Sequence, residues 1–105
     1  MVKLKFDGEN ALVIGGGITG AEVAVELAKE GKKVTIIEVM DQFLALPSAV
    51  IPAYQMAVEQ AGVKVITGHR LDYVDHDQAI IVDLLEIKRI KADGGIVISV
   101  DLCHN

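Results

Sequence analysis

The most specific chemistry in this sequence belongs to a glycine-rich hexapeptide, Gly15-Gly16-Gly17-Ile18-Thr19-Gly20, which matches the pattern Gly-x-Gly-x-x-Gly. Gly15 permits a tight turn, Gly17 lets a ligand approach the backbone, and Gly20 lets a following helix lie close to a sheet. The N–H groups of Ile18, Thr19 and Gly20 then face the ligand, with the positive end of the helix dipole behind them. The hexapeptide therefore predicts a cradle for a pyrophosphate.

Glu38 is the second candidate, because it follows Gly17 by 21 positions and ends an apolar run. This spacing is typical of the acid that accepts hydrogen bonds from the ribose diol of a dinucleotide. The same carboxylate would repel a 2′-phosphate, and residues 39–50 contain no Arg or Lys to receive one. The pair predicts NAD(H) rather than NADP(H) as the ligand.

The elements around these residues are those that such a site needs. Residues 10–14 form an apolar run typical of a strand buried on both faces, and residues 18–30 have a helical pattern ended by Gly31. Residues 33–39 read as a second buried strand, so the hexapeptide lies inside a β-α-β unit. A glycine turn that merely reverses the chain is the alternative, and this context favours the dinucleotide.

Beyond this unit we expect a second helix near 51–61, with Pro52 in its first turn and Gly62 as its cap, and a third strand at 63–67. Short extended segments with turns at 76–78 and 92–95 predict an antiparallel meander, and residues 96–100 predict a last buried strand. The fold class is therefore α/β: a Rossmann-like parallel sheet with a β-α-β-α-β core, an antiparallel β-meander insertion and a final parallel strand.

Composition narrows the class of protein. The chain has 105 residues, of which 51% are apolar and 24% charged, so one globular domain is expected. Its net charge of −5 argues against nucleic acid or an anionic membrane as the partner, and its apolar runs are too short to span a bilayer. The single cysteine, Cys103, cannot close an internal disulfide and fits a cytoplasmic location.

No metal site is expected. His69, His76 and His104 are scattered, and the acidic stretch that begins at Asp72 lacks the Gly and terminal Glu of a calcium loop. We expect no catalytic side chain either, and Cys103 reads as a packed or terminal thiol.

Residues 15–24 resemble the NAD-binding domain of the pyridine nucleotide–disulfide oxidoreductase family, which typically reads Gly-x-Gly-x-x-Gly/Ala-x-Glu-x-Ala. The family's FAD domain more often has Pro-Ala where this chain has Ile18-Thr19. The resemblance runs from about residue 10 to residue 105 and includes Asp93 before an apolar strand. The tail is similar to the family's Ala-x-Gly-x-x-Pro-Asn return strand, with Asp101 in place of the Gly and His104 in place of the Pro.

The resemblance implies that NADH binds here and gives a hydride to FAD on another domain of the same parent chain, with Glu22 on the nicotinamide side. It implies that residues 1–105 are a single NAD(H)-binding domain of a larger NADH-dependent flavoprotein oxidoreductase, inactive alone, and it allows a homodimer of the parent. An ordinary surface residue remains the alternative for Glu22. A non-catalytic NAD(H) sensor, an FAD-binding domain and a methyltransferase remain alternatives for the whole.

Overall fold

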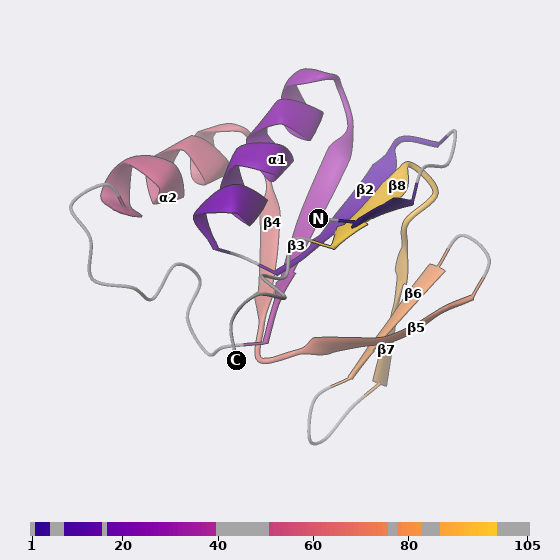
Figure 1. Cartoon of the computed structure of the whole chain (residues 1–105). Coiled ribbons are helices and arrows are strands. Elements are labelled where there is room, and N and C mark those ends of the chain that lie inside the picture. Colours follow the sequence, from indigo (N-terminus) through magenta and orange to yellow (C-terminus); the bar gives the residue numbers. More distant parts are fainter. Residues whose placement is uncertain are drawn as a thin grey trace.

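The computed structural model describes residues 2–4, 8–15, 17–39, 51–75, 78–82 and 87–98. These residues form two helices and eight strands in the order β1-β2-α1-β3-α2-β4-β5-β6-β7-β8 (Figure 1). The helices are α1 (Ile18–Lys29) and α2 (Ile51–Gln60). The strands are β1 (Val2–Leu4), β2 (Asn10–Ile14), β3 (Lys33–Glu38), β4 (Lys64–Thr67), β5 (Arg70–Asp75), β6 (Gln78–Val82), β7 (Ile87–Lys91) and β8 (Gly95–Ile98).

The main sheet has the strand order β1-β8-β2-β3-β4. Strands β8, β2, β3 and β4 run parallel, and β1 joins the edge antiparallel to β8. In this register Leu12 of β2 lies between Thr35 of β3 and Ile96 of β8. Because the strands are parallel, their carboxyl ends meet at one edge, where α/β proteins bind their ligands.

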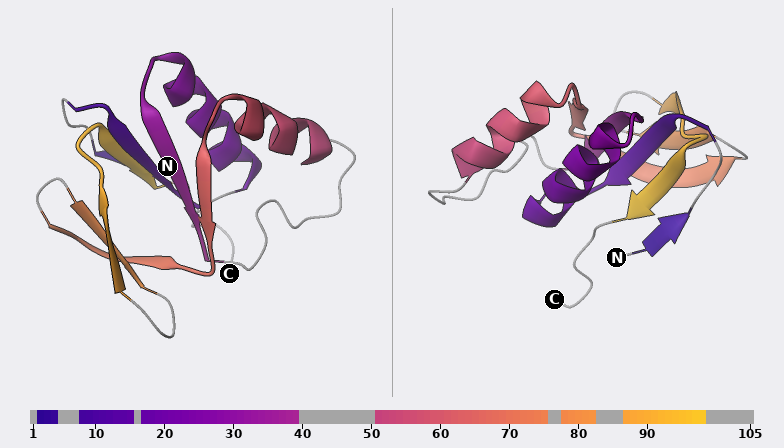
Figure 2. Two further views of the ribbon diagram at one scale, coloured as in Figure 1. Left: turned by 180° about the vertical axis from the view of Figure 1, so that it is seen from behind. Right: turned by 90° about the horizontal axis from the view of Figure 1, so that it is seen from above.

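The two faces of the sheet carry different cores, since successive strand residues point to opposite faces. Ala11 and Val13 of β2 pack with Ala21 and Ala24 of α1, and the same cluster includes Val58 of α2. Leu12 belongs to a second cluster that includes Ile81 of β6. The result is three layers: two helices, the parallel sheet, and the small sheet β5-β6-β7 on the opposite face (Figure 2).

The sequence accounts for the ends of the helices. α1 begins after Gly17 and ends near Gly31, which adopts φ +91° and donates a hydrogen bond to the carbonyl of Ala28 (3.0 Å). Gly62 follows α2 with φ +77° and donates to the carbonyl of Glu59 (3.1 Å). Both glycines occupy the left-handed region in which a side chain is disfavoured, so these two helix stops are confirmed.

The amino-terminal end of β2 is held by hydrogen bonds from both side-chain and backbone groups. Asp93 Oδ1 accepts hydrogen bonds from the backbone N–H (2.9 Å) and the side-chain amide (3.1 Å) of Asn10. These bonds, led by the one from the backbone N–H, lower the pKa of the Asp93 carboxyl. Gly8 donates to the Asp93 carbonyl, and Gly94 donates to the Asn10 carbonyl, each at 2.6 Å. The turn before β8 is thereby tied to the start of β2.

The predicted fold class is confirmed, with the predicted helices and the strands at 10–14, 33–39 and 63–67 ending within a residue or two of their expected positions. The meander is also confirmed, with a register shift between Leu71 and Tyr73 of β5. Strand β1 was not predicted, because its three residues alternate between apolar and polar but are too few for a pattern to distinguish a strand. Neither α1 nor α2 has the length and apolar character needed to cross a bilayer, so the described residues contain no candidate membrane helix.

Candidate functional site

The glycine turn lies at the carboxyl edge of the parallel sheet, directly after β2. Gly15 has φ +97°, a conformation that a side chain disfavours, so a glycine is required there for the turn itself. Its N–H donates to the carbonyl of Ile37 on β3 (2.8 Å). The bond joins the start of the turn to the end of the neighbouring strand, where Glu38 follows.

Gly17 has a different reason to be glycine. Its φ of −57° is accessible to any residue, and a Cβ built on it would meet no atom of the described residues within 4 Å. Neither backbone conformation nor packing within the described residues therefore demands glycine at this position. A glycine in front of open space leaves the backbone accessible to a ligand, as the sequence predicts.

The first turn of α1 begins at this open position. The earliest helical hydrogen bond runs from the N–H of Ala21 to the carbonyl of Gly17 (2.9 Å), and Gly17 supplies no side-chain cap. The N–H groups of Ile18, Thr19 and Gly20 precede that bond and lie at the positive end of the helix dipole. The side chain of Thr19 is exposed and Gly20 is buried, so this turn meets solvent on one side and the core on the other.

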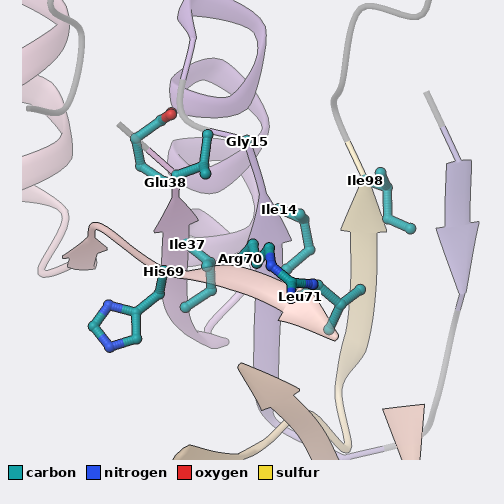
Figure 3. Close-up of a pocket in the computed structure, with 9 residues that line it drawn as sticks. Ile14, Gly15, Ile37, Glu38, His69, Arg70, Leu71 and Ile98 are labelled. Atoms are coloured by element: carbon teal, nitrogen blue, oxygen red, sulfur yellow. The ribbon is translucent and has the colours of Figure 1, made fainter. Parts of the chain in front are cut away.

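Glu38 and Gly15, the first residue of the glycine turn, line one pocket. Glu38 is 9% exposed at the end of β3, and its pocket has a volume of about 400 Å³. Figure 3 shows Glu38 beside Gly15, above the ends of the strands, with Ile14, Ile37 and Ile98 below them. The structure thus brings together two residues that the sequence separates by more than 20 positions. The remaining lining residues are Val39, His69, Arg70 and Leu71.

His69 and Arg70 are pocket residues that the sequence analysis did not identify. The His69 N–H donates to the carbonyl of Glu38 (3.2 Å), and its ring Nδ1 lies 2.7 Å from the carbonyl of Thr67. A carbonyl only accepts, so Nδ1 carries the proton in this contact. Arg70 Nη1 lies 3.6 Å from Asp72 Oδ1, and the Arg70 side chain is 64% exposed.

Glu22 lies on the exposed side of α1 and is not among the residues that line this pocket. Its Oε1 accepts a hydrogen bond from the hydroxyl of Tyr54 on α2 (2.9 Å). The bond to the carboxylate, and the negative charge itself, raise the pKa of Tyr54. The contact holds Glu22, which follows the first turn of α1, against α2.

Comparison with known proteins gives the family. The family model described as pyridine nucleotide-disulphide oxidoreductase matches residues 1–103, almost the whole chain. The chain belongs to this family. Dihydrolipoyl dehydrogenase of Chlorobaculum tepidum is 42% identical over 72 residues, which are 68% of this chain and 15% of that protein.

Two further similar proteins cover more of the chain. Ferredoxin–NADP reductase of Rickettsia felis is 29% identical over 100 residues, which are 91% of this chain and 30% of that protein. The structure of T. acidophilum thioredoxin reductase superposes with a TM-score of 0.75 at 27% identity and covers 91% of this chain and 32% of that one. The chain therefore spans less than a third of the length of each of these proteins.

Members of this family are oxidoreductases that depend on FAD and NAD(P)H, and this chain matches a part of their length. The resemblance stated from residues 15–24 is thereby confirmed at the level of the family. Gly16, Asp101 and His104 lie outside the described residues, so the middle glycine of the turn and the two departures in the tail remain predictions of the sequence.

The two missed pocket residues show the limit of reading the sequence for a site. Residues 39–50, which follow Glu38 directly in the sequence, contain no Lys or Arg. His69 directly precedes β5 and Arg70 begins it, and the pairing of Glu38 with Thr67 brings that segment to the same edge. The strand predicted at residues 63–67 runs parallel to β3, so the residues that follow it reach the same carboxyl edge as Glu38.

Proposed function

We propose that this chain is the NADH-binding domain of a larger FAD-dependent oxidoreductase. The observation that carries the proposal is Gly17, which neither backbone conformation nor packing requires and in front of which no described atom lies within 4 Å. A pyrophosphate approaching the start of α1 supplies the reason for that glycine. Gly15 and Gly20, one required by the turn and one buried in the helix, complete the pattern.

The cradle binds the diphosphate through the backbone. The N–H groups of Ile18, Thr19 and Gly20 donate to phosphate oxygens, and the helix dipole adds a positive field. No Lys or Arg is needed for this contact, so the net charge of −5 is no obstacle to an anionic ligand. The middle residue, Gly16, belongs to the same proposed cradle.

In this proposal Glu38 binds the adjacent ribose. Its carboxylate accepts hydrogen bonds from the two ribose hydroxyls, and a bond to a charged acceptor contributes about 1.5–3 kcal/mol. A 2′-phosphate at the same place would put two anions together in a pocket where Glu38 is only 9% exposed. This repulsion favours NADH over NADPH.

NADPH is the second candidate because Arg70 lines the same pocket. A guanidinium there could pair with a 2′-phosphate, and two of the curated relatives are ferredoxin–NADP reductases from Rickettsia felis and Metallosphaera sedula. We favour NADH since Glu38 is the buried group beside Gly15. Arg70 is largely exposed and already lies 3.6 Å from the carboxylate of Asp72.

The domain's part in the reaction is to position the nicotinamide. When bound, NADH supplies a hydride, and the FAD that accepts it is carried by another domain of the parent chain. Glu22 is proposed to lie on the nicotinamide side, held by the hydroxyl of Tyr54. No side chain of this domain is required to form or break a bond, so alone it should bind NADH without oxidising it.

Calorimetric titration of NADH, NADPH and FAD against the same protein tests the assignment. NADH should bind most tightly, and Gly17→Val should lose NADH binding because its side chain fills the space meant for the pyrophosphate. Its circular dichroism and melting curve show whether the fold survives. Unchanged NADH affinity in a folded Gly17→Val variant would refute the cradle.

The same titration separates the alternatives. Tighter binding of FAD than of NADH would assign the chain as a flavin domain instead. A dye-reduction assay without added flavoprotein should show no NADH oxidation, and turnover by the pure chain would overturn the role of a binding domain. Turnover that stays absent even with the parent's flavin domain present would favour an NAD(H) sensor.

A further inference from the structure

The small sheet β5-β6-β7 has one face against the main sheet and one face turned away from it (Figure 2). Ile81 of β6 and Ile90 of β7 belong to the cluster that also contains residues of the parallel sheet. Because successive residues of a strand point to opposite faces, the neighbours of these two residues face away from that cluster. On β6 these neighbours are Ile80 and Val82, and Val82 pairs with Ile87 of β7. The sheet therefore carries apolar side chains on its outer face as well as on its inner face.

A register shift in β5 turns Tyr73 toward this outer face. Leu71 pairs with Ile81, and both pack in the buried cluster. Tyr73 lies two positions after Leu71, so a regular strand would place it on the inner face too. The shift instead pairs Tyr73 with Ile80, whose neighbour Ile81 faces inward. An irregularity of this kind re-aims a side chain, and here it brings an aromatic ring to the outside of the sheet.

Tyr73, Ile80, Val82 and Ile87 form one continuous apolar surface, which we call the outer face. Tyr73 pairs with Ile80, which lies two residues before Val82 on the same strand, and Ile87 continues the surface on β7. Tyr73 is 50% exposed and Ile87 is 73% exposed. They are two of the four large hydrophobic side chains that the described residues leave exposed, and the other two are not on this sheet. A single exposed apolar side chain is ordinary, whereas a contiguous group is typical of an interaction surface.

The size of the outer face indicates what kind of partner it fits. Three strands about 4.8 Å apart, each of five to six residues at about 3.3 Å, cover roughly 200 Å². A stable contact between free proteins buries about 800 Å² on each partner. The outer face alone is therefore too small to hold a separate protein, a second copy of this chain included. A domain of the same polypeptide needs far less, since the covalent link keeps it at an effective concentration of about 1 mM.

We propose that the outer face packs against an apolar surface on another domain of the parent chain. The inference rests on the proposed function only in taking this chain as one domain of a larger oxidoreductase, and not on the nucleotide that it binds. The chain spans 15% of the Chlorobaculum tepidum dihydrolipoyl dehydrogenase and 30% of the Rickettsia felis reductase, so a protein of either length has further residues to supply the partner. Tyr73 and Ile87 lose their contact with water in this arrangement.

Strand β5 also connects the outer face with the proposed dinucleotide pocket. Arg70 and Leu71 at the start of β5 line that pocket. Tyr73 follows Arg70 by three residues, about 10 Å of strand. A domain on the outer face therefore lies beside the pocket in which the nucleotide is proposed to bind.

Hydroxyl-radical footprinting of the complete parent protein tests the proposal by measuring how fast Tyr73 is oxidised. Ile87→Lys places a charge in the docked face, so the two domains should separate there and Tyr73 should react about threefold faster or more. Ile87 is 73% exposed in this domain, so the variant should keep its fold, which circular dichroism checks. Ile87→Ser removes the apolar side chain without adding a charge, and it should change the oxidation of Tyr73 in the same direction.

Met56→Lys is the matched control, since it makes the same change at a side chain of α2 that is 59% exposed, on the other side of the main sheet (Figure 2). It should leave the oxidation of Tyr73 unchanged. The proposal is overturned if Tyr73 reacts equally fast with and without Ile87→Lys, or if Met56→Lys exposes it as much.

The association state of the parent protein separates the remaining partner. If Ile87→Lys converts a dimer into monomers in sedimentation, the outer face contacts a second copy and the proposal is wrong. Calorimetry of the same protein with NADH tests the proposed function by itself, because the protection of Tyr73 requires no bound nucleotide. Failure of NADH to bind and failure of Tyr73 to be protected are therefore distinct results.

Discussion

The two ends of strand β2 use glycine for opposite reasons. At the carboxyl end, a Cβ on Gly17 would meet none of the described atoms within 4 Å. At the amino end, a Cβ on Gly94 would lie 2.6 Å from the carbonyl oxygen of Gly8 and 2.9 Å from the backbone nitrogen of Asn10. A Cβ on Gly8 would collide with the carboxylate of Asp93. We call these the open end and the locked end.

The difference teaches how to separate a glycine kept for folding from one kept for a ligand. At the locked end the chain itself occupies the space, and the hydrogen bonds between Asn10 and Asp93 hold it there. At the open end no described atom occupies the space in front of Gly17, and Glu38 lines a pocket with Gly15 of the same turn. Both ends contain glycines, but the atoms around them favour a role in stability at one end and a role in binding at the other.

The matched pair Gly94→Ala and Gly17→Ala gives the largest expected contrast. Gly94→Ala forces backbone atoms apart and should cost about 1–3 kcal/mol of unfolding free energy, or roughly 4–8 °C in Tm for each kcal/mol. Gly17→Ala should change the free energy of unfolding by less than about 0.5 kcal/mol, and it should weaken the binding of NADH. Thermal melting and calorimetry measure both effects. Equal loss of stability in the two variants would remove the distinction between the ends.

The charge at the open end is tested by Glu38→Ala and Arg70→Ala. Loss of the Glu38 carboxylate should weaken the binding of NADH by about 1.5 kcal/mol, roughly tenfold. It should also reduce the difference in affinity between NADH and NADPH. Arg70→Ala should leave NADH affinity unchanged.

Glu38→Gln is the matched control for Glu38→Ala, since it keeps the shape of the side chain and removes the charge. If either Glu38 variant still prefers NADH as strongly as the parent sequence does, the ribose assignment is wrong. A Glu38→Gln variant that binds NADPH only while Arg70 is present would instead make Arg70 the receiver of a 2′-phosphate.

The locked end should respond to acid through Asp93. Because the folded protein lowers the pKa of this carboxyl below its ordinary 3.8, the charged form stabilises the fold. That contribution is complete above the ordinary pKa and is lost as the pH falls through the lower folded value. Asp93→Asn keeps an acceptor but not the charge, so its stability deficit should be constant near neutral pH and shrink below pH 3.8.

Urea unfolding as a function of pH measures this deficit. Glu59→Gln, on the exposed side of α2, is the control and should show no deficit of this kind. If the stability deficit of Asp93→Asn is the same at acid and neutral pH, the charge of Asp93 does not stabilise the locked end.

The smallest effect is expected at Tyr54, where α2 meets α1 near the open end. The hydrogen bond to Glu22 raises the pKa of this phenol, so its contribution to stability is present below pH 10 and is lost as the pH rises through the higher folded pKa. A phenolate absorbance titration of the Tyr73→Phe variant isolates Tyr54, because the chain has two tyrosines. Adding Glu22→Gln should lower the measured pKa; no change would show that the contact is not made in solution.

Much of the open end could be predicted from sequence because its determinants are local. Gly15, Gly17 and Glu38 lie within one β-α-β unit, and hydrophobic periodicity places them at a strand end, a helix start and the next strand end. The outer face of the meander could not be predicted in this way. Tyr73 and Ile87 come from different strands, and only the register shift in β5 turns Tyr73 to the face that carries Ile87.

The sequence by itself therefore determined the order of the elements, the glycine turn, and the acid that follows it, since each depends on neighbours within a few turns or strands. Tertiary structure decided which glycines face empty space, that His69 and Arg70 join Glu38, and that β1 pairs with β8. The physical reason is that these outcomes depend on atoms brought together from distant segments, and a one-dimensional pattern records the spacing along the chain but not the space between layers.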